Sequence, residues 1–273
     1  MSSPLPGFRL TLGVSLLFMG VMFLLPLVVL VLQLQQLSWA DYWALISDRR
    51  VLASLRLTFG CALVASGVNL LLGLLFAWVL SRYRFPGRGL LDLLMDLPLA
   101  LPTAVAGIAL TTLLAPTGLL GRPLAALGLE LAYRPAGIVI ALVFTSLPFI
   151  VRALQPVLAA LPPAPEEAAR TLGASEFQIF SRVILPLLLP ALVSGFMLSL
   201  ARSLGEFGAV IFIAGNQPYV SEVLSLLIFS AASEYDLPRA CALASLLLAS
   251  TLLLLALANR WQHFFVRRLG AGL

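Results

Sequence analysis

Long runs of apolar residues, separated by short polar stretches, make up most of this chain. A helix needs about 20 predominantly apolar residues to cross the hydrocarbon core of a bilayer. Six runs reach that length, and they predict transmembrane helices at residues 12–36, 57–81, 94–115, 136–155, 184–214 and 241–259. We therefore expect an all-α polytopic membrane protein in which residues 1–273 form a single transmembrane domain.

The third predicted span is punctuated by three prolines, Pro98, Pro102 and Pro116. Each proline removes a backbone donor, and its ring clashes with the preceding turn of a helix. Within lipid, the carbonyls freed in this way need partners on neighbouring helices or in a water-filled cavity. We expect a kinked helix in the bundle interior, where these prolines serve either helix packing alone or the passage of a substrate.

The composition agrees with lipid as the main solvent of the chain. Hydrophobic residues account for 61% of the 273 residues and charged residues for 11%, whereas a soluble domain is roughly a quarter charged. The net charge of +5 rests on arginines, because the sequence contains no lysine. These arginines form short clusters between apolar runs, a distribution that argues against a nucleic-acid-binding surface.

Six spans place both termini on the same side of the membrane, and the arginine counts indicate which side. If the termini lie inside, the inner segments hold ten arginines, the outer segments hold six, and Arg202 remains within the membrane. Arginine and lysine are enriched in short cytoplasmic loops. The distribution therefore predicts that both termini are cytoplasmic.

The longest polar interruption on the predicted inner side covers residues 156–183 and carries signals of short helices. Pro165 suits the first turn of a helix, where its missing N–H costs nothing. Glu166 and Glu167 follow at the positive end of the helix dipole, and Gly173 can end this helix in a left-handed conformation. A solvated hairpin and a rigid handle for a partner protein are both compatible with this pattern.

A second helix is predicted directly after the glycine. Ser175 and Gln178 stand three residues apart, as the two members of a capping box do. The helix that they begin runs into the fifth predicted span. The segment thus predicts a short helix, a glycine corner and a new helix that enters the bilayer.

Two charged residues lie inside the fifth predicted span. Arg202 and Glu206 are four residues apart, so that on a helix they share a face and can pair. An ionised group at the bilayer centre costs at least about 2.5–3.5 kcal/mol, which requires this face to point into the bundle. Two interpretations stay open: an internal salt bridge that fixes helix packing, or a lining or gating element of an anion path.

Neighbouring residues extend this polar region. Gly205 permits close helix approach or local unwinding, and we expect Asp96, which precedes Pro98, in the same polar layer. The candidates for a translocation path or gate are therefore Arg202, Gly205, Glu206, Asp96, Pro98 and Pro102.

The stretch EAARTLGASEFQIFSRVILP resembles the E-A-A-x3-G-x9-I-x-L-P loop of permease subunits of ABC importers. The positions that match in register are Glu167, Ala168, Ala169, Gly173, Leu185 and Pro186, and Val183 replaces the isoleucine of the pattern. In that family the loop forms a coupling helix, which docks in a groove on the ATPase subunit. The resemblance implies that residues 166–173, beginning with Glu166, make this contact here.

Three further stretches, RSLGEFGAVIFIAGN, RYRFPGRGLLDLLMDLPLALPTAVAG and PTGLLG, resemble the oxyanion branch of the same family. The resemblance is closest to the T-type permeases of sulfate/thiosulfate importers and extends over essentially the whole chain. It implies a type I ABC importer permease fold in a bacterial inner membrane. It also implies the partners: a second homologous permease, two copies of an ABC ATPase subunit and a periplasmic sulfate-binding protein.

Two alternatives follow from weaker features. Molybdate permeases are similar around RSLGEFGA, so molybdate, tungstate or another oxyanion is an alternative substrate. A secondary transporter or channel that works alone is more remote, because the internal inverted repeats typical of such proteins are not evident in the sequence.

Residues needed for ATP hydrolysis are missing from the sequence. Without any lysine a Walker A loop is impossible, so ATP and Mg²⁺ must be used by a partner ATPase. Cys61 and Cys241 match no metal or redox spacing, and His263 is the only histidine. We therefore expect a transporter subunit that is not an enzyme and binds no cofactor.

Overall fold

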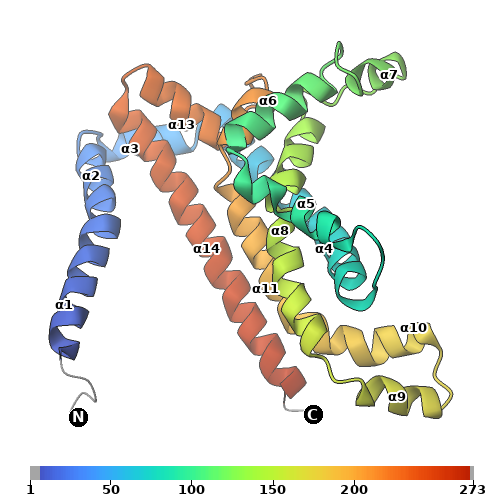
Figure 1. Ribbon diagram of the computed structural model, residues 1–273. Helices are drawn as coiled ribbons and strands as arrows, with labels where there is room; N and C mark the ends of the chain where they lie inside the picture. The colour runs from blue at the N-terminus through green and yellow to red at the C-terminus, as the bar shows by residue number, and fades with distance from the viewer. Residues whose placement is uncertain (1–6, 271–273) are drawn as a thin grey trace.

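The computed structural model describes the backbone of residues 7–270 and the side chains of residues 7–260. Within this part every regular element is helical, as Figure 1 shows. The first half of the chain forms α1 (Phe8–Met19), η1 (Gly20–Leu24), α2 (Leu25–Leu34), α3 (Trp39–Ile46), α4 (Arg49–Arg82), α5 (Arg88–Ala100), α6 (Thr103–Leu114) and α7 (Gly121–Ala126). The second half forms α8 (Pro135–Ala160), α9 (Ala164–Thr171), α10 (Glu176–Ile179), η2 (Phe180–Ile184), α11 (Leu185–Leu204), α12 (Gly208–Ile213), α13 (Leu224–Ser233) and α14 (Leu237–Gly270). The elements η1 and η2 are short π-helical stretches inside longer helices.

Within residues 7–270, five continuous helices are long and apolar enough to cross a membrane. They are Phe8–Leu34, Arg49–Arg82, Pro135–Ala160, Glu176–Leu204 and Leu237–Arg260, and the bent pair of α5 and α6 counts as a sixth span. The predicted all-α polytopic fold is thus confirmed. The first turn of α1 and the last turns of α14 lie at the same end of the bundle as α9 and α10, whereas α3, α6, α7 and α13 lie at the opposite end (Figure 1).

The third span differs from the single kinked helix expected over residues 94–115. Its first helix begins at Arg88, and the helix axis turns by 108° between α5 and α6. Leu101 lies at the break in an extended conformation (φ −82°, ψ 134°), because a residue that precedes proline is disfavoured in the helical region. Pro98 stays inside α5. The break therefore occurs at Pro102.

The fifth span ends earlier than the expected boundary at residue 214. Its continuous helix covers Glu176–Leu204, Gly205 follows as the C-cap, and α12 starts anew at Gly208. Glycine has the weakest helix preference of any residue except proline, and two glycines three residues apart favour an interruption. The local unwinding expected near Gly205 is present at this position.

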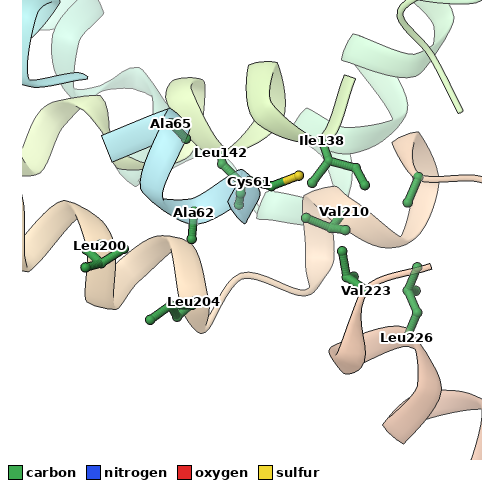
Figure 2. Packing of buried hydrophobic residues seen from close by; sticks show 11 residues of the cluster. Cys61, Ala62, Ala65, Ile138, Leu142, Leu200, Leu204, Val210, Val223 and Leu226 are labelled. Atoms are coloured by element: carbon green, nitrogen blue, oxygen red, sulfur yellow. The ribbon is translucent and has the colours of Figure 1, made fainter. Parts of the chain in front are cut away.

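The core of the bundle forms where α4, α8 and α11 pack against one another. Figure 2 shows a cluster in which the fully buried Ala62 and Ala65 of α4 pack with Ile138 of α8. Small side chains allow helix backbones to approach closely inside a membrane. Gly73 has the same effect further along α4, because a Cβ at this position would lie 2.5 Å from Cγ2 of Ile150.

A buried polar network lies inside the same three-helix core. Asn69 of α4 donates hydrogen bonds to the Ser146 hydroxyl at 2.8 Å and to the Val143 carbonyl at 3.2 Å, both on α8. Ser199 and Ser203 of α11 donate to the Ser146 hydroxyl at 3.1 Å each. Hydrogen bonds between membrane helices contribute about 0.6 kcal/mol each on average. This network therefore favours one rotational position of the three helices about their axes.

The first span stands apart from this core. No residue of α1 or α2 is buried; α2 contacts α14 at the edge of the bundle, and α1 lies away from it (Figure 1). The apolar side chains of this span are therefore available to lipid or to another protein chain.

Candidate functional site

The segment between α8 and α11 folds into a hairpin of two short helices. The first, α9, has Pro165 and two glutamates in its first turn. Gly173 has a φ of +81°, and the N–H of Ala174 donates a hydrogen bond to the carbonyl of Ala169 at 3.0 Å. This bond is characteristic of a Schellman motif, in which a left-handed glycine follows the end of a helix. The predicted glycine corner is confirmed.

The start of the second helix is fixed by its own cap. The Ser175 N–H donates to Gln178 Oε1 at 2.8 Å, and the Gln178 N–H donates to Ser175 Oγ at 3.3 Å, which confirms the predicted capping box. Across the corner, Arg170 donates two hydrogen bonds to Glu176, at 3.0 and 3.1 Å. The Glu176 carboxylate raises the pKa of the Arg170 guanidinium above its ordinary value. Caps and ion pair together hold α9 at a set angle to α10.

An ion pair joins this hairpin to the membrane bundle. Arg82 Nη2, at the end of α4, lies 2.5 Å from Glu166 Oε1 in the first turn of α9, and the Glu166 side chain is 12% exposed. The Arg82 guanidinium also lies 5.3 Å from the centre of the Trp78 ring, within the range of a cation–π interaction. The sequence did not predict this contact, because the two partners are separated by 84 residues.

One part of the coupling motif forms an exposed surface. Glu167 and Ala168 are exposed on α9. Leu172 and Phe177 are also largely exposed, at 88% and 77%, and they extend this surface around the corner to α10. Apolar side chains this exposed beside charged ones are typical of a surface that binds another protein.

The other part of the motif packs inward. Ala169 and Leu185 contact the hydrophobic cluster formed by α4, α8 and α11 near the hairpin. Pro186 is exposed and lies in the first turn of α11, directly after the π-helical stretch η2. Because proline removes a helix hydrogen bond, a wider π turn at this position lets the helix continue through it. The inward residues therefore fix the hairpin, and the outward ones are available for contact.

The two intramembrane charges of the fifth span meet, as predicted. Arg202 Nη2 lies 2.6 Å from Glu206 Oε2, an ion pair whose angles fall outside hydrogen-bond geometry. The Glu206 side chain is 1% exposed and that of Arg202 31%. The other oxygen, Glu206 Oε1, accepts a hydrogen bond from the Ala209 N–H at 2.9 Å. Glu206 therefore joins the end of α11 to the start of α12 across the break.

The break after α11 places α12 against α6. A Cβ on Gly107 of α6 would lie 2.5 Å from the carbonyl oxygen of Ala209, and a Cβ on Gly208 would collide with the Thr103 hydroxyl. Glycine at both positions therefore permits the close approach of the two backbones. Since α6 and α12 each follow a break, the two interrupted spans meet at this contact.

Asp96 differs from its expected place, because its partner is Arg152 of α8 rather than Arg202. Arg152 donates from Nε to Asp96 Oδ1 and from Nη1 to Asp92 Oδ1, both at 2.8 Å, and Nη1 also donates to Gln155 Oε1 at 2.5 Å. The side chains of Arg152, Asp92 and Asp96 are 34%, 44% and 42% exposed. Charged groups of this exposure avoid lipid, so this face of α5 and α8 turns toward water or another chain.

Arg152, Asp92, Asp96 and Gln155 are called the Arg152 cluster below, and the sequence does contain a signal for it. Arg152 interrupts the apolar run of the fourth predicted span before its end, and a charged residue inside a span needs a partner or water. The identity of that partner is what the sequence leaves unspecified.

A further unpredicted ion pair lies at the opposite end of α4. The Glu222 side chain, just before α13, is fully buried and accepts two hydrogen bonds from Arg50, at 2.7 and 2.6 Å. Nearby, the Leu224 N–H donates to Thr58 Oγ1 at 2.9 Å. These contacts hold the start of α13 against α4.

These features define a class of protein. A bundle of apolar helices with two interrupted spans, charged side chains turned away from lipid and a rigid hairpin beyond the bundle is the architecture of a membrane transport permease. The chain belongs to the family of binding-protein-dependent transport system inner membrane components, whose profile matches residues 69–271.

Relatives are similar along nearly their whole length. The sulfate transport system permease protein CysT of Escherichia coli (strain K12) is 55% identical over 264 residues, which cover 97% of this chain and 95% of that protein. The CysT protein of Synechocystis sp. is 41% identical over 92% of this chain and 88% of that protein.

Solved structures share the fold at low sequence identity. A bacterial ABC transporter involved in the import of alginate contains a chain that matches with a TM-score of 0.76 and 17% identity, covering 94% of each chain. A chain of the MetNI methionine ABC transporter matches with a TM-score of 0.57 and 20% identity, covering 85% of this chain and 99% of that one. The predicted ABC importer permease fold is thereby confirmed.

Proposed function

We propose that this chain is the permease subunit of an ATP-driven importer for sulfate and thiosulfate in a bacterial inner membrane. The observation that carries the proposal is the 55% identity to the E. coli sulfate permease over 97% of the chain. An identity of this extent includes the hairpin and both interrupted spans. The same relationship therefore supports the coupling contact and the transport path together.

The α9–α10 hairpin is the proposed contact with the ATPase subunit. Its outer surface carries Glu167 and Ala168, and its root is joined to α4 by Glu166 and Arg82. When the partner ATPase binds ATP it displaces α9, and the ion pair transmits this displacement to α4. In this proposal the permease binds no cofactor, and ATP and Mg²⁺ are used by the ATPase alone.

The proposed anion path begins at the charged break of the fifth span. Arg202, which is partly exposed, supplies the positive potential that an oxyanion needs in a medium of low polarity. Glu206 keeps this guanidinium in place, and Gly205 allows the chain to unwind beside it. In this proposal the ion pair of Arg202 and Glu206 both fixes helix packing and lines the anion path.

The third span supplies the proposed gate. Asp96 and its partner Arg152 hold α5 against α8, and the break at Pro102 allows α5 and α6 to take different directions. Pro98, inside α5, lacks one helix hydrogen bond and makes that helix easier to bend. Alternating access then results from rigid-body rotation of two permease halves.

The partly exposed Arg152 cluster supports a second protein chain on this face. We propose a homologous permease as that chain, together with two copies of an ABC ATPase subunit and a periplasmic sulfate-binding protein. In this proposal the end of the bundle with α9 lies in the cytoplasm together with both termini, as the arginine counts favour.

Uptake of labelled sulfate tests the proposal. A bacterial strain that lacks its own sulfate importers receives this chain with its partner subunits, and we expect ATP-dependent uptake that excess thiosulfate inhibits and molybdate does not. Preferential uptake of molybdate would contradict the assigned substrate. Sulfate transport by the purified chain alone in vesicles, without ATP, would contradict the importer itself.

A further inference from the structure

A pocket of about 500 Å³ lies between the end of α4 and the helix formed by α10 and η2. Leucines of α4 line one wall, together with Trp78 and Tyr83 at the end of that helix. Ile179, Phe180 and Ile184 line the opposite wall. The pocket is therefore mainly apolar and lies at the root of the coupling hairpin.

The pocket wall is in contact with the ion pair that joins the hairpin to the bundle. Trp78 packs edge to face against Phe180, with ring centres 5.4 Å apart. The Arg82 guanidinium lies over the Trp78 ring, and the same guanidinium pairs with Glu166 of α9. An occupant of the pocket therefore touches the aromatic ring that supports the α4–α9 contact.

Three arginines lie close in sequence to the lining residues Trp78 and Tyr83. Arg82, Arg84 and Arg88 fall within seven residues at the turn from α4 to α5. Arg84 and Arg88 are exposed and form no ion pair with a described residue. The buried Arg82 Nε has no hydrogen-bond partner among the described residues. Glu176 lines the pocket. Its carboxylate is already paired, since it accepts two hydrogen bonds from Arg170 across the glycine corner.

An apolar slot, two aromatic rings and unpaired guanidinium groups at the end of a membrane helix match the chemistry of an anionic phospholipid. Aromatic side chains such as Trp78 and Tyr83 are enriched at the level of the lipid headgroups, and basic pockets between helices bind anionic headgroups. A free phosphate or a nucleotide would leave the apolar walls in contact with water, which is unfavourable.

We propose that this pocket binds one acyl chain of an anionic phospholipid, with the lipid phosphate held by Arg84, the neighbour in sequence of the lining residue Tyr83. The bound lipid supports the stack of Trp78 beneath Arg82 and so stabilises the contact with Glu166. Lipid binding itself is independent of the transported substrate. Its effect on ATPase coupling rests on the proposed function.

Native mass spectrometry of the purified full chain tests the site, with phosphatidylglycerol and phosphatidylcholine of the same acyl composition as probes. We expect one phosphatidylglycerol molecule to stay bound and phosphatidylcholine to dissociate. Leu75 lines the pocket and is 56% exposed, so Leu75→Trp fills the slot. Displacement of two methylene groups from an apolar site corresponds to a loss of affinity of about tenfold.

Matched controls separate this effect from general damage. Leu63 is an exposed residue of α4 outside the pocket, so Leu63→Trp should leave lipid binding unchanged. Arg84→Gln removes an exposed charge without a packing change and should weaken phosphatidylglycerol binding about fivefold. Arg122→Gln, at an exposed basic residue of α7 at the opposite end of the bundle (Figure 1), should have no effect.

Equal retention of the two lipids, or unchanged binding in both Leu75→Trp and Arg84→Gln, would overturn the proposal. Loss of the bound lipid when the partner permease is co-purified would overturn it too, because a protein chain would then be the occupant. A site that binds lipid normally in a chain that supports no sulfate uptake would leave the lipid site standing and would count against the proposed transport function.

Discussion

Gly173 offers a substitution that perturbs the coupling hairpin through its backbone alone. Its φ of +81° lies in the left-handed region, and a Cβ at this position would meet no atom within 4 Å. A side chain here therefore introduces backbone strain without a steric clash. For an ordinary residue the left-handed conformation costs about 1–2 kcal/mol.

A strain of this size changes how often the hairpin keeps its shape. It raises the population of distorted hairpins relative to the intact form by about five- to thirtyfold. Asparagine tolerates the left-handed region, whereas a β-branched residue is a strong outlier there. We therefore expect coupling to decrease in the order wild type, Gly173→Asn, Gly173→Ala, Gly173→Val.

The assay is the ratio of ATP hydrolysed to sulfate imported by the assembled importer in proteoliposomes. This ratio should rise along the series, because a distorted hairpin lets the ATPase turn over without moving the bundle. Gly128 supplies the control: it has a φ of +77° and no atom within 4 Å of a Cβ, but it lies between α7 and α8 at the opposite end (Figure 1). A wild-type ratio in Gly173→Val, or an equal rise in Gly128→Val, would refute the reasoning.

Two further predictions concern packing inside the bundle. Arg152→Gln removes the ion pairs between α5 and α8 and should lower the free energy of unfolding by about 1–3 kcal/mol in detergent. Arg134→Gln, which breaks an exposed pair, should change it by less than about 0.5 kcal/mol. Gly107→Ala places a methyl group 2.5 Å from the Ala209 carbonyl oxygen and should cost about 1–3 kcal/mol, whereas Gly67→Ala, with no atom within 4 Å, should be neutral or slightly stabilising. Equal melting temperatures within either pair of variants would contradict the corresponding contact.

The coupling hairpin was predictable because its signals act over a few residues. Ser175 and Gln178 satisfy each other's backbone groups, and Gly173 ends its helix whatever surrounds it. The pairing of Arg202 with Glu206 was predictable for the same reason, since the spacing of four residues sets their distance. None of these interactions requires knowledge of how one helix lies against another.

Contacts between distant segments lie beyond such reasoning. Arg82 and Glu166 are 84 residues apart, and Arg50 and Glu222 are 172 apart, so their pairing depends on the rotation of each helix within the bundle. Asp96 illustrates the point. Its place in a polar layer follows from its position in a span, but only the packing of α5 on α8 selects its partner.

The interruptions of the spans were predictable in position but not in size. Pro98 and Pro102 are each compatible with a kink or with a complete break. In the structure the helix continues through Pro98, whereas at Pro102 the helix axis turns by 108°. After Pro102, α6 packs on α12 through Gly107. This tertiary contact favours the sharp turn, and a pattern of apolar residues along one span contains no information about it.

Helix α4 differs from the interrupted spans in a way that bears on transmission. It has 34 residues and no proline, so it extends over about 51 Å at 1.5 Å per residue. Both of its ends are held by ion pairs: Arg82 binds Glu166 of the hairpin, and Arg50 binds the buried Glu222 before α13. Sharp kinks occur at prolines, Gly/Ser pairs, π-bulges or inserted groups. Helix α4 contains no proline and no π-helical stretch, and it is continuous through Ser66 and Gly67. We therefore predict that, in the proposed coupling, α4 carries a displacement of α9 toward the far end of the bundle.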